Sequence, residues 1–142
     1  MKDRHSKNLG GWGVAALCVL TGWLAAAQVR AEDDIPDVNP MSGDQKAINS
    51  GKSWFRGVCA LCHGGRADGA GERGNGADLR KFKLGFKKFV ETVHNGRTIQ
   101  GRSQNMPAWK GVLDDKQIYE IGAYLETLAI EGANWKEGAK ED

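Results

Sequence analysis

The sequence of 142 residues is poor in cysteine, in net charge and in strand-like patterns. Its three cysteines allow one disulfide at most, which excludes a fold built on a disulfide framework. The 20 Lys and Arg residues nearly balance the 18 Asp and Glu residues, so the chain is not built to hold nucleic acid by neutralising phosphates. No segment alternates apolar and polar residues as a half-buried strand does. The expected fold class is therefore all-α.

The first 31 residues are typical of a secretory signal peptide. A basic start is followed by an uncharged run from Leu9 to Ala27, and small residues then stand at Val29 and Ala31. The run approaches the roughly 20 residues that a spanning helix needs, so an uncleaved membrane anchor is the alternative. Four glycines in the run favour cleavage after about Ala31. Cleavage would leave a periplasmic protein of 111 residues with net charge −1.

The rest of the chain divides into a lead-in, one domain and a tail. Residues 32–43 contain two prolines and no apolar period, which indicates an extended lead-in. Residues 44–130 form the domain, and we expect the charged tail 131–142 to fray. Within the domain, residues 64–80 are predicted to be a glycine-rich loop and residues 97–113 to be irregular.

Three helices are expected in the domain, over residues 44 to about 60, 86–94, and 114 to about 130. Ser42 or Asp44 can cap the first helix, and Asn95-Gly96 is a typical end for the second. Asp114 and Gln117 have the spacing of a capping box at the start of the third helix. The apolar face of this third helix comprises Ile118, Ile121, Leu125 and Leu128.

The glycine-rich loop contains a formal GxGxxG pattern at Gly69–Gly74. Such a pattern binds dinucleotides only when it follows a buried strand and opens a helix. No apolar strand precedes it here, so nucleotide binding is excluded. We expect a flexible surface loop whose glycines permit positive φ angles.

The motif that carries chemistry is Cys59-Ala60-Leu61-Cys62-His63. Two cysteines three residues apart at the end of a helix lie on one face. Cys59 and Cys62 can therefore form two thioethers with the vinyl groups of one haem, and His63 can then bind the iron. The motif predicts one covalently attached haem c.

Two other interpretations of the motif are weaker. A zinc site needs further nitrogen or sulfur ligands at zinc-finger spacing, and only His94 remains after the motif. A thioredoxin-like dithiol needs a βαβ context, which the sequence lacks.

Met106 is the candidate for the second axial ligand of the iron. Pro107 follows it and restrains the backbone around it, which suits a thioether that must stay on a metal. Met106 as simple packing is the alternative. Met41 is a weaker candidate because it lies in the less restrained lead-in. His94 is also weaker: a histidine in the last turn of a helix typically lies at the surface or interacts with the helix dipole.

Over residues 46–130 the sequence resembles the soluble, monohaem class I c-type cytochromes. The resemblance implies a cytochrome c fold, with three to five helices wrapped around one covalently bound haem. It also implies that Gly51 lets the first helix approach the last one closely, with Ile121 and Tyr124 as contacts. The family often has a proline whose carbonyl group orients the ligand histidine. None lies between His63 and Met106, so the carbonyl partner of His63 stays open. The matching positions are Gly51, Phe55, Cys59–His63, Ile121, Tyr124, residues 89–96 and residues 106–109.

The haem would be the centre of a small core. Arg97 and Arg102 are candidates for pairing with its propionates, and a solvated loop charge is the alternative for each. The apolar residues expected to wall the haem are Phe82, Leu84, Phe86, Phe89, Trp109, Leu113 and Leu128.

An iron with His and Met ligands has no open site for a substrate and cycles by one electron. The sequence therefore predicts an electron carrier and not an enzyme. Two alternatives remain: a haem protein that binds gas or peroxide through a labile Met106, and a membrane-tethered cytochrome domain of an oxidase chain.

Short matches at residues 39–43, 77–80 and 106–111 are similar to small periplasmic cytochromes that accept electrons from PQQ-dependent alcohol dehydrogenases, including methanol dehydrogenases. The resemblance implies a periplasmic quinoprotein dehydrogenase as donor and a downstream cytochrome or oxidase as acceptor. A run of basic residues could steer an acidic donor surface, with a solvated helix face as the alternative. The run comprises Arg80, Lys81, Lys83, Lys87 and Lys88.

Overall fold

A computed structural model of the chain describes residues 34–74, 76–101 and 105–135. The chain divides into two units, Met1–Glu32 and Asp33–Asp142. The predicted signal peptide belongs to the first unit and lies outside the described residues, so its structure and cleavage stay predictions. All that follows concerns the second unit.

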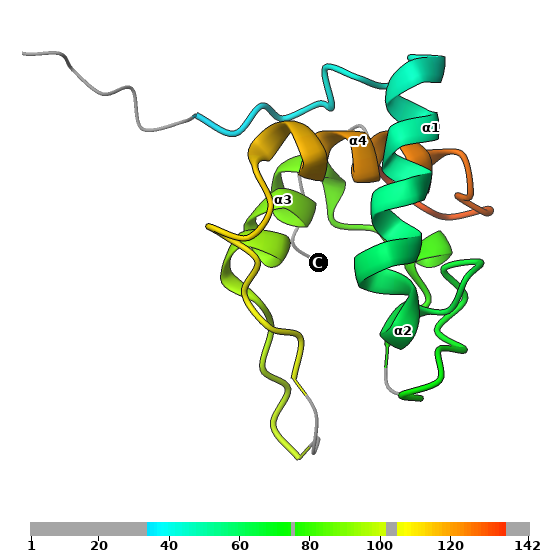
Figure 1. Ribbon diagram of the computed structural model, residues 1–142, viewed down its shortest axis with the longest axis vertical. Helices are drawn as coiled ribbons and strands as arrows, with labels where there is room; N and C mark the ends of the chain where they lie inside the picture. Colours follow the sequence, from blue (N-terminus) through cyan, green and yellow to red (C-terminus); the bar gives the residue numbers. More distant parts are fainter. Residues whose placement is uncertain (1–33, 75, 102–104, 136–142) are drawn as a thin grey trace, which may run out of the picture. The chain divides into compact units, whose positions relative to one another are not determined.

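Helices organise the described residues, and their only strand-like features are isolated bridges. Helix α1 (Gln45–Trp54) continues without a break into the π-helical turn η1 (Phe55–Cys59) and the short helix α2 (Ala60–His63). The remaining elements are η2 (Leu79–Lys81), α3 (Gly85–Asn95) and α4 (Asp115–Glu126). Figure 1 shows α1 and α2 as one column, with α4 crossing beside α1. The all-α fold class is confirmed.

Side-chain caps set the beginnings of the two helices that cross. The Asp44 carboxylate accepts hydrogen bonds from the backbone N–H groups of Lys46 and Ala47, so Asp44 is the cap of α1. Asp114 and Gln117 form the expected capping box at α4. The first predicted helix ends three residues later than expected, at His63, and α4 ends at Glu126, before the expected Ile130.

The crossing of α1 and α4 depends on the absence of a side chain at Gly51. A Cβ atom placed there would lie 1.8 Å from the carbonyl oxygen of Glu120 and 2.8 Å from the nitrogen of Ile121. One turn later Phe55 meets Tyr124, with ring centroids 5.7 Å apart. The expected close approach at Gly51 is confirmed.

The lead-in is attached to α4 instead of running free. Asn39 is buried; its side-chain N–H donates to the carbonyl oxygen of Tyr119, and its amide oxygen accepts from the backbone of Met41. The hydroxyl group of Ser42 donates to the Glu126 carboxylate over 2.6 Å. Residues 40–43 form a turn, so only the start of the lead-in is extended.

The beginning of the tail is also ordered, contrary to the expected fraying. Trp135 is 4% exposed and packs on Phe82 and Phe89, with ring centroids 4.9 and 5.2 Å apart. The backbone N–H of Asn134 donates to the carbonyl oxygen of Phe82 over 2.7 Å. Burial of the Trp135 ring therefore holds the start of the tail in place, although the tail is rich in charged residues. Residues 136–142 lie outside the described residues.

Candidate functional site

A mostly apolar slot lies between the α1–α2 column, α3 and α4. The enclosed part of the slot is narrow, with a volume of about 50 Å³. Three of its lining residues carry sulfur or imidazole groups, namely Cys59, His63 and Met106. The other lining residues are Phe55, Leu79, Phe82, Phe89, Thr92, Val93, Trp109, Leu113, Ile121 and Leu125.

The two motif cysteines lie at the end of the long helix, where its geometry changes. Cys59 closes the π-helical turn and lines the slot, and Cys62 lies one turn later at intermediate exposure. Neither forms a disulfide. Burial, and secondarily the neighbouring Cys62, raises the pKa of the Cys59 thiol to about 12. Such a thiol stays protonated at neutral pH, which disfavours a reactive redox dithiol.

The carbonyl partner of His63, left open by the sequence, is Ala77. His63 Nδ1 lies 3.0 Å from the carbonyl oxygen of Ala77, and this nitrogen must carry the proton because a carbonyl can only accept. In the neutral imidazole the other ring nitrogen, Nε2, is then unprotonated and has a lone pair for a metal. A carbonyl fourteen residues along the chain thus fixes the imidazole tautomer.

The loop that supplies Ala77 is packed tightly on the motif, so its expected flexibility is wrong. Backbone N–H groups of Gly69, Arg73 and Gly76 donate to the carbonyl oxygens of His63, Leu61 and Cys62. A Cβ atom on Gly76 would lie 2.1 Å from the Cys62 oxygen, and one on Gly71 would lie 2.5 Å from the Leu61 oxygen. Close approach requires these two glycines, whereas Gly69 has the expected positive φ of 80°.

Met106 is held in the slot by its backbone. Its N–H donates to the Arg97 carbonyl oxygen over 3.0 Å, and its own carbonyl oxygen accepts from the Arg97 N–H over 2.9 Å. A Cβ atom on Gly96 would lie 2.5 Å from the Met106 oxygen, so the glycine that ends α3 also makes room for this strand-like pair. The Trp109 N–H donates to the carbonyl oxygen of Val93. Residues 106–109 are therefore strapped to the end of α3.

The wall of the slot differs in part from the expected set. Phe82, Phe89, Trp109 and Leu113 line it as predicted. Phe86 is fully buried but faces Tyr119 of α4, Leu84 is 37% exposed, and Leu128 lines a different groove. The lining residues that the sequence analysis did not assign to the wall are Phe55, Leu79, Thr92, Val93, Ile121 and Leu125. Most of these residues lie on helix faces that the apolar spacing of the sequence indicates. The spacing does not show which other element each face packs against.

The remaining charged candidates do not line the slot. Arg97 is exposed, and Arg102 lies outside the described residues. His94 is buried and not at the surface; its Nε2 lies 2.7 Å from the Asp115 carboxylate, which ties α3 to α4. In the described part of the chain, no three His, Cys, Asp or Glu side chains cluster as a metal site would require.

The residues of the slot fit one haem attached to the chain. Two free thiols three residues apart can form thioethers, and an imidazole whose Nδ1 is engaged and a thioether line the same apolar space. The arrangement defines a c-type cytochrome.

Comparison with known proteins agrees with this class. The family model "Cytochrome C oxidase, cbb3-type, subunit III" matches residues 46–125, and the chain belongs to this family of cytochrome c domains. It is a class I monohaem cytochrome with one covalently bound haem c.

Three relatives illustrate the range of the family. The subunit CcoP of the cbb3-type cytochrome c oxidase of Azospirillum sp. (strain B510) is 36% identical over 89% of this chain and 44% of the relative. Cytochrome c6 of Tetradesmus obliquus is 33% identical over 60% of this chain and 93% of the relative. The crystal structure of cytochrome CL from the methylotroph Methylophaga aminisulfidivorans has a TM-score of 0.52 at 25% identity, covering 63% of this chain and 60% of that one. This chain thus spans less than half of the CcoP relative.

No helix within residues 34–74, 76–101 and 105–135 is both long enough and apolar enough to cross a bilayer.

Proposed function

We propose that Cys59 and Cys62 attach the haem, that His63 and Met106 bind its iron, and that the protein works as a periplasmic one-electron carrier and not as an enzyme. The observation that carries the proposal is the common position of His63 and Met106 on one apolar slot, each held by backbone hydrogen bonds. The bound haem supplies one-electron chemistry. The chain orients the imidazole through Ala77, restrains the thioether through Arg97 and excludes water with apolar walls.

The proposed electron donor is a PQQ-dependent alcohol or methanol dehydrogenase, and the acceptor is a downstream cytochrome or oxidase. Three short sequence matches support this partner, together with the structural likeness to a cytochrome CL from a methylotrophic bacterium. A quinohemoprotein alcohol dehydrogenase of Pseudomonas putida, ADH-IIG, is also 29% identical over 73% of this chain and 14% of the relative.

An apolar patch suited to a brief encounter lies at the motif end of the molecule. Leu61, between the two cysteines, is 44% exposed. Short-lived electron-transfer complexes are typically small, so a limited apolar contact of this kind is sufficient.

The test is reduction of the oxidised holoprotein by the quinoprotein dehydrogenase of the same organism, with its alcohol as substrate. We expect rapid reduction whose rate depends on ionic strength. Absence of reduction would remove the donor assignment and leave the electron carrier. A wild-type protein that binds CO readily would instead favour the gas-binding alternative.

A second candidate is a cytochrome domain tethered to an oxidase chain, and the identity to CcoP favours it. The N-terminus of the exported protein distinguishes the two. An N-terminus near Glu32 supports the free periplasmic carrier, whereas retention of residues 1–31 supports the tethered domain.

A further inference from the structure

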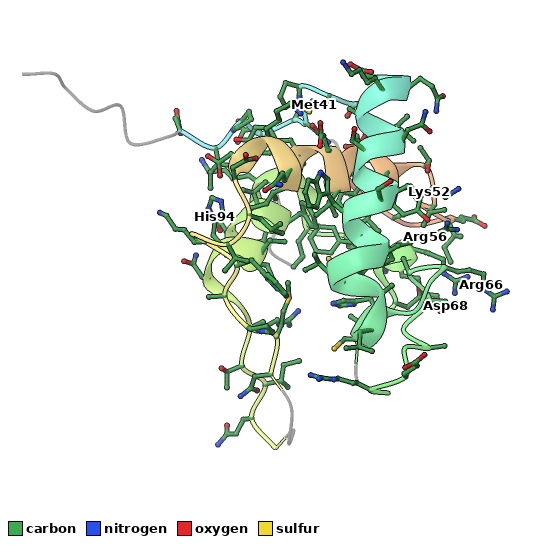
Figure 2. The ribbon with its side chains drawn as sticks, viewed as in Figure 1. Met41, Lys52, Arg56, Arg66, Asp68 and His94 are labelled. Carbon is green, nitrogen blue, oxygen red and sulfur yellow. The ribbon has the colours of Figure 1, made fainter. Side chains whose placement is uncertain are left out.

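A second groove lies outside the haem slot and shares no lining residue with it. One face of α1 and η1 forms one side, through residues 45, 48, 49, 52 and 56. The loop after α2, η2 and the segment after α4 complete it. Figure 2 shows the side chains of Lys52, Arg56 and Arg66 gathered on this side of the molecule. The lining residues, here called the basic groove, are Gln45, Ile48, Asn49, Lys52, Arg56, Gly65, Arg66, Arg80, Tyr124, Thr127, Leu128 and Ile130.

The basic groove is lined by four cations and by no carboxylate. Two of the cations have nearby partners, since Arg80 pairs with Asp78 at 2.9 Å and Arg66 with Asp68 at 3.1 Å. Lys52 and Arg56 are exposed, and no carboxylate of the described residues lies within ion-pair distance of either. The groove therefore keeps an excess of positive charge.

The basic run expected to steer a partner has a carboxylate near most of its cations. Lys88 pairs with Glu91 at 3.0 Å, Lys81 lies 3.7 Å from Asp78, and Lys87 lies 4.0 Å from Asp34. Among the described residues, only Lys83 of the run has no such neighbour. The run has three nearby carboxylates for its five cations and the groove has two for its four, so both keep a similar excess of positive charge. The groove differs in adding a concave shape and apolar lining residues, which favours it as a docking site.

The shape and chemistry of the basic groove favour an extended ligand over a small ion. Its volume of about 610 Å³ far exceeds the roughly 30 Å³ that one water molecule occupies. The lining also includes the apolar side chains of Ile48, Leu128 and Ile130 and two amide side chains, and Ile130 is 43% exposed. Apolar surface next to unpaired cations suits a segment that carries both carboxylates and apolar side chains.

We propose that the basic groove docks an acidic segment of a redox partner protein, with carboxylates on Lys52 and Arg56 and apolar side chains over Ile48 and Leu128. This docking site and the haem slot share no lining residue. A partner held here can still meet the apolar patch at Leu61 or exchange places with a second partner there. The inference depends on the proposed function in one respect only, namely that the partner is a redox protein.

The test is titration of the oxidised holoprotein with a fluorescent, capped synthetic peptide rich in glutamate with leucine at intervals. We expect Lys52→Glu with Arg56→Glu to weaken peptide binding at least about tenfold, because each reversal replaces an attraction for the peptide carboxylates by a repulsion. The matched control, Lys83→Glu with Lys110→Glu, makes the same change in net charge on exposed residues outside the groove. It should change the affinity by about twofold at most, because distant exposed charges are screened.

Three outcomes would overturn the inference. Equal weakening in both double variants would show that net charge alone attracts the peptide. A peptide with serine in place of leucine that binds equally well would remove the apolar contact. Binding of inorganic phosphate or of phosphatidylglycerol vesicles that depends on Lys52 and Arg56, without peptide binding, would assign the groove to another anion. All variants should keep the haem spectrum and be reduced by ascorbate; a wild type that no dehydrogenase reduces would count against the proposed donor and not against the groove.

Discussion

At the scale of single residues, the site depends on backbone groups that hold functional side chains. His63 and Met106 each receive their position from a distant carbonyl or N–H group, Ala77 for the imidazole and Arg97 for the thioether segment. Glycines at positions 71, 76 and 96 make these approaches possible, because a Cβ atom at each would overlap backbone atoms. Glycines, which carry no functional group, therefore decide where the two proposed ligands lie.

The first prediction concerns Met106. Met106→Ala should abolish the weak long-wavelength absorption band typical of iron–methionine ligation, lower the reduction potential and allow CO to bind, because the thioether is lost. The absorption spectrum with and without CO checks this. His94→Ala is the control: its Nε2 is engaged by Asp115, so it should change stability and leave the band unaltered. Loss of the band in His94→Ala alone would refute the ligand assignment.

The second prediction compares two glycines of the loop after the motif. Gly76→Ala places a Cβ atom 2.1 Å from the Cys62 oxygen, so the loop must move and His63 loses the correct position of its carbonyl partner. We expect a loss of at least about 2 kcal/mol in the free energy of unfolding, together with a shifted reduction potential. Gly65→Ala meets no atom within 4 Å and should change either quantity little. Equal effects of the two changes would contradict the role of close packing.

At the scale of elements, the continuous helix from α1 through η1 to α2 links the crossing with α4 to the haem motif. Gly51 and Phe55 contact α4 from this helix, and Cys59 and His63 line the slot from its last turns. The π-helical turn lies between the residues that contact α4 and those that line the slot, and such turns are frequent at functional sites. A disturbance at the crossing should therefore reach the site.

The third prediction tests this link with two glycines of the same helix. Gly51→Ala would place a Cβ atom 1.8 Å from the Glu120 oxygen, which forces α1 and α4 apart. We expect a loss of several kcal/mol, on the order of 3, in the free energy of unfolding and poor haem maturation. Gly57→Ala meets nothing within 4 Å and should be neutral or slightly stabilising. Urea denaturation of both variants measures the difference; similar midpoints would show that the crossing tolerates a side chain.

At the scale of the whole molecule, the second unit is closed by contacts between its two ends and α3–α4. Asn39 attaches the lead-in to α4, and Trp135 covers Phe82 and Phe89 from the other end of the chain. Phe82 and Phe89 line the haem slot on their other side. The ends of the described chain thus support the slot from behind without contributing a ligand.

The fourth prediction is the acid dependence of the folded protein. Hydrogen bonds and ion pairing with Arg80 lower the pKa of Asp78 from 3.8 to about 2. The charged form is therefore favoured in the folded state, and this stabilisation is present above about pH 3.8 and is lost as the pH falls towards about 2. Because Asp78 follows Ala77, its protonation should also loosen the carbonyl partner of His63.

Urea denaturation at several pH values checks the acid dependence. Asp78→Asn should lower the stability above pH 3.8 and reduce its fall between pH 3.8 and about 2. Asp34→Asn is the control, since the Asp34 side chain is fully exposed and its nearest cation among the described residues, Lys87, lies as far as 4.0 Å away. Its charge should therefore contribute little to stability. An unaltered acid profile in Asp78→Asn would exclude Asp78 as a cause.

The sequence by itself determined the local features of this protein. Asp114 and Gln117 cap α4, the apolar spacing of residues 86–94 marks α3, and the Cys59–His63 motif predicts the cofactor. These features depend on interactions between residues three or four positions apart, which spacing along the chain displays directly. The likeness to known cytochromes also indicated the approach at Gly51.

Only the tertiary structure decided which distant groups meet. The sequence could not indicate that Ala77 orients His63, that Trp135 is buried, or that Val93 and not Phe86 lines the slot. The same holds for charge, because Lys88 and Arg80 are paired, while Lys52 and Arg56 have no carboxylate of the described residues within ion-pair distance. The physical reason is that a carbonyl group, a Cβ clearance or an ion pair depends on the path of the chain between two segments, and the residues at the meeting point carry no pattern that specifies their partner.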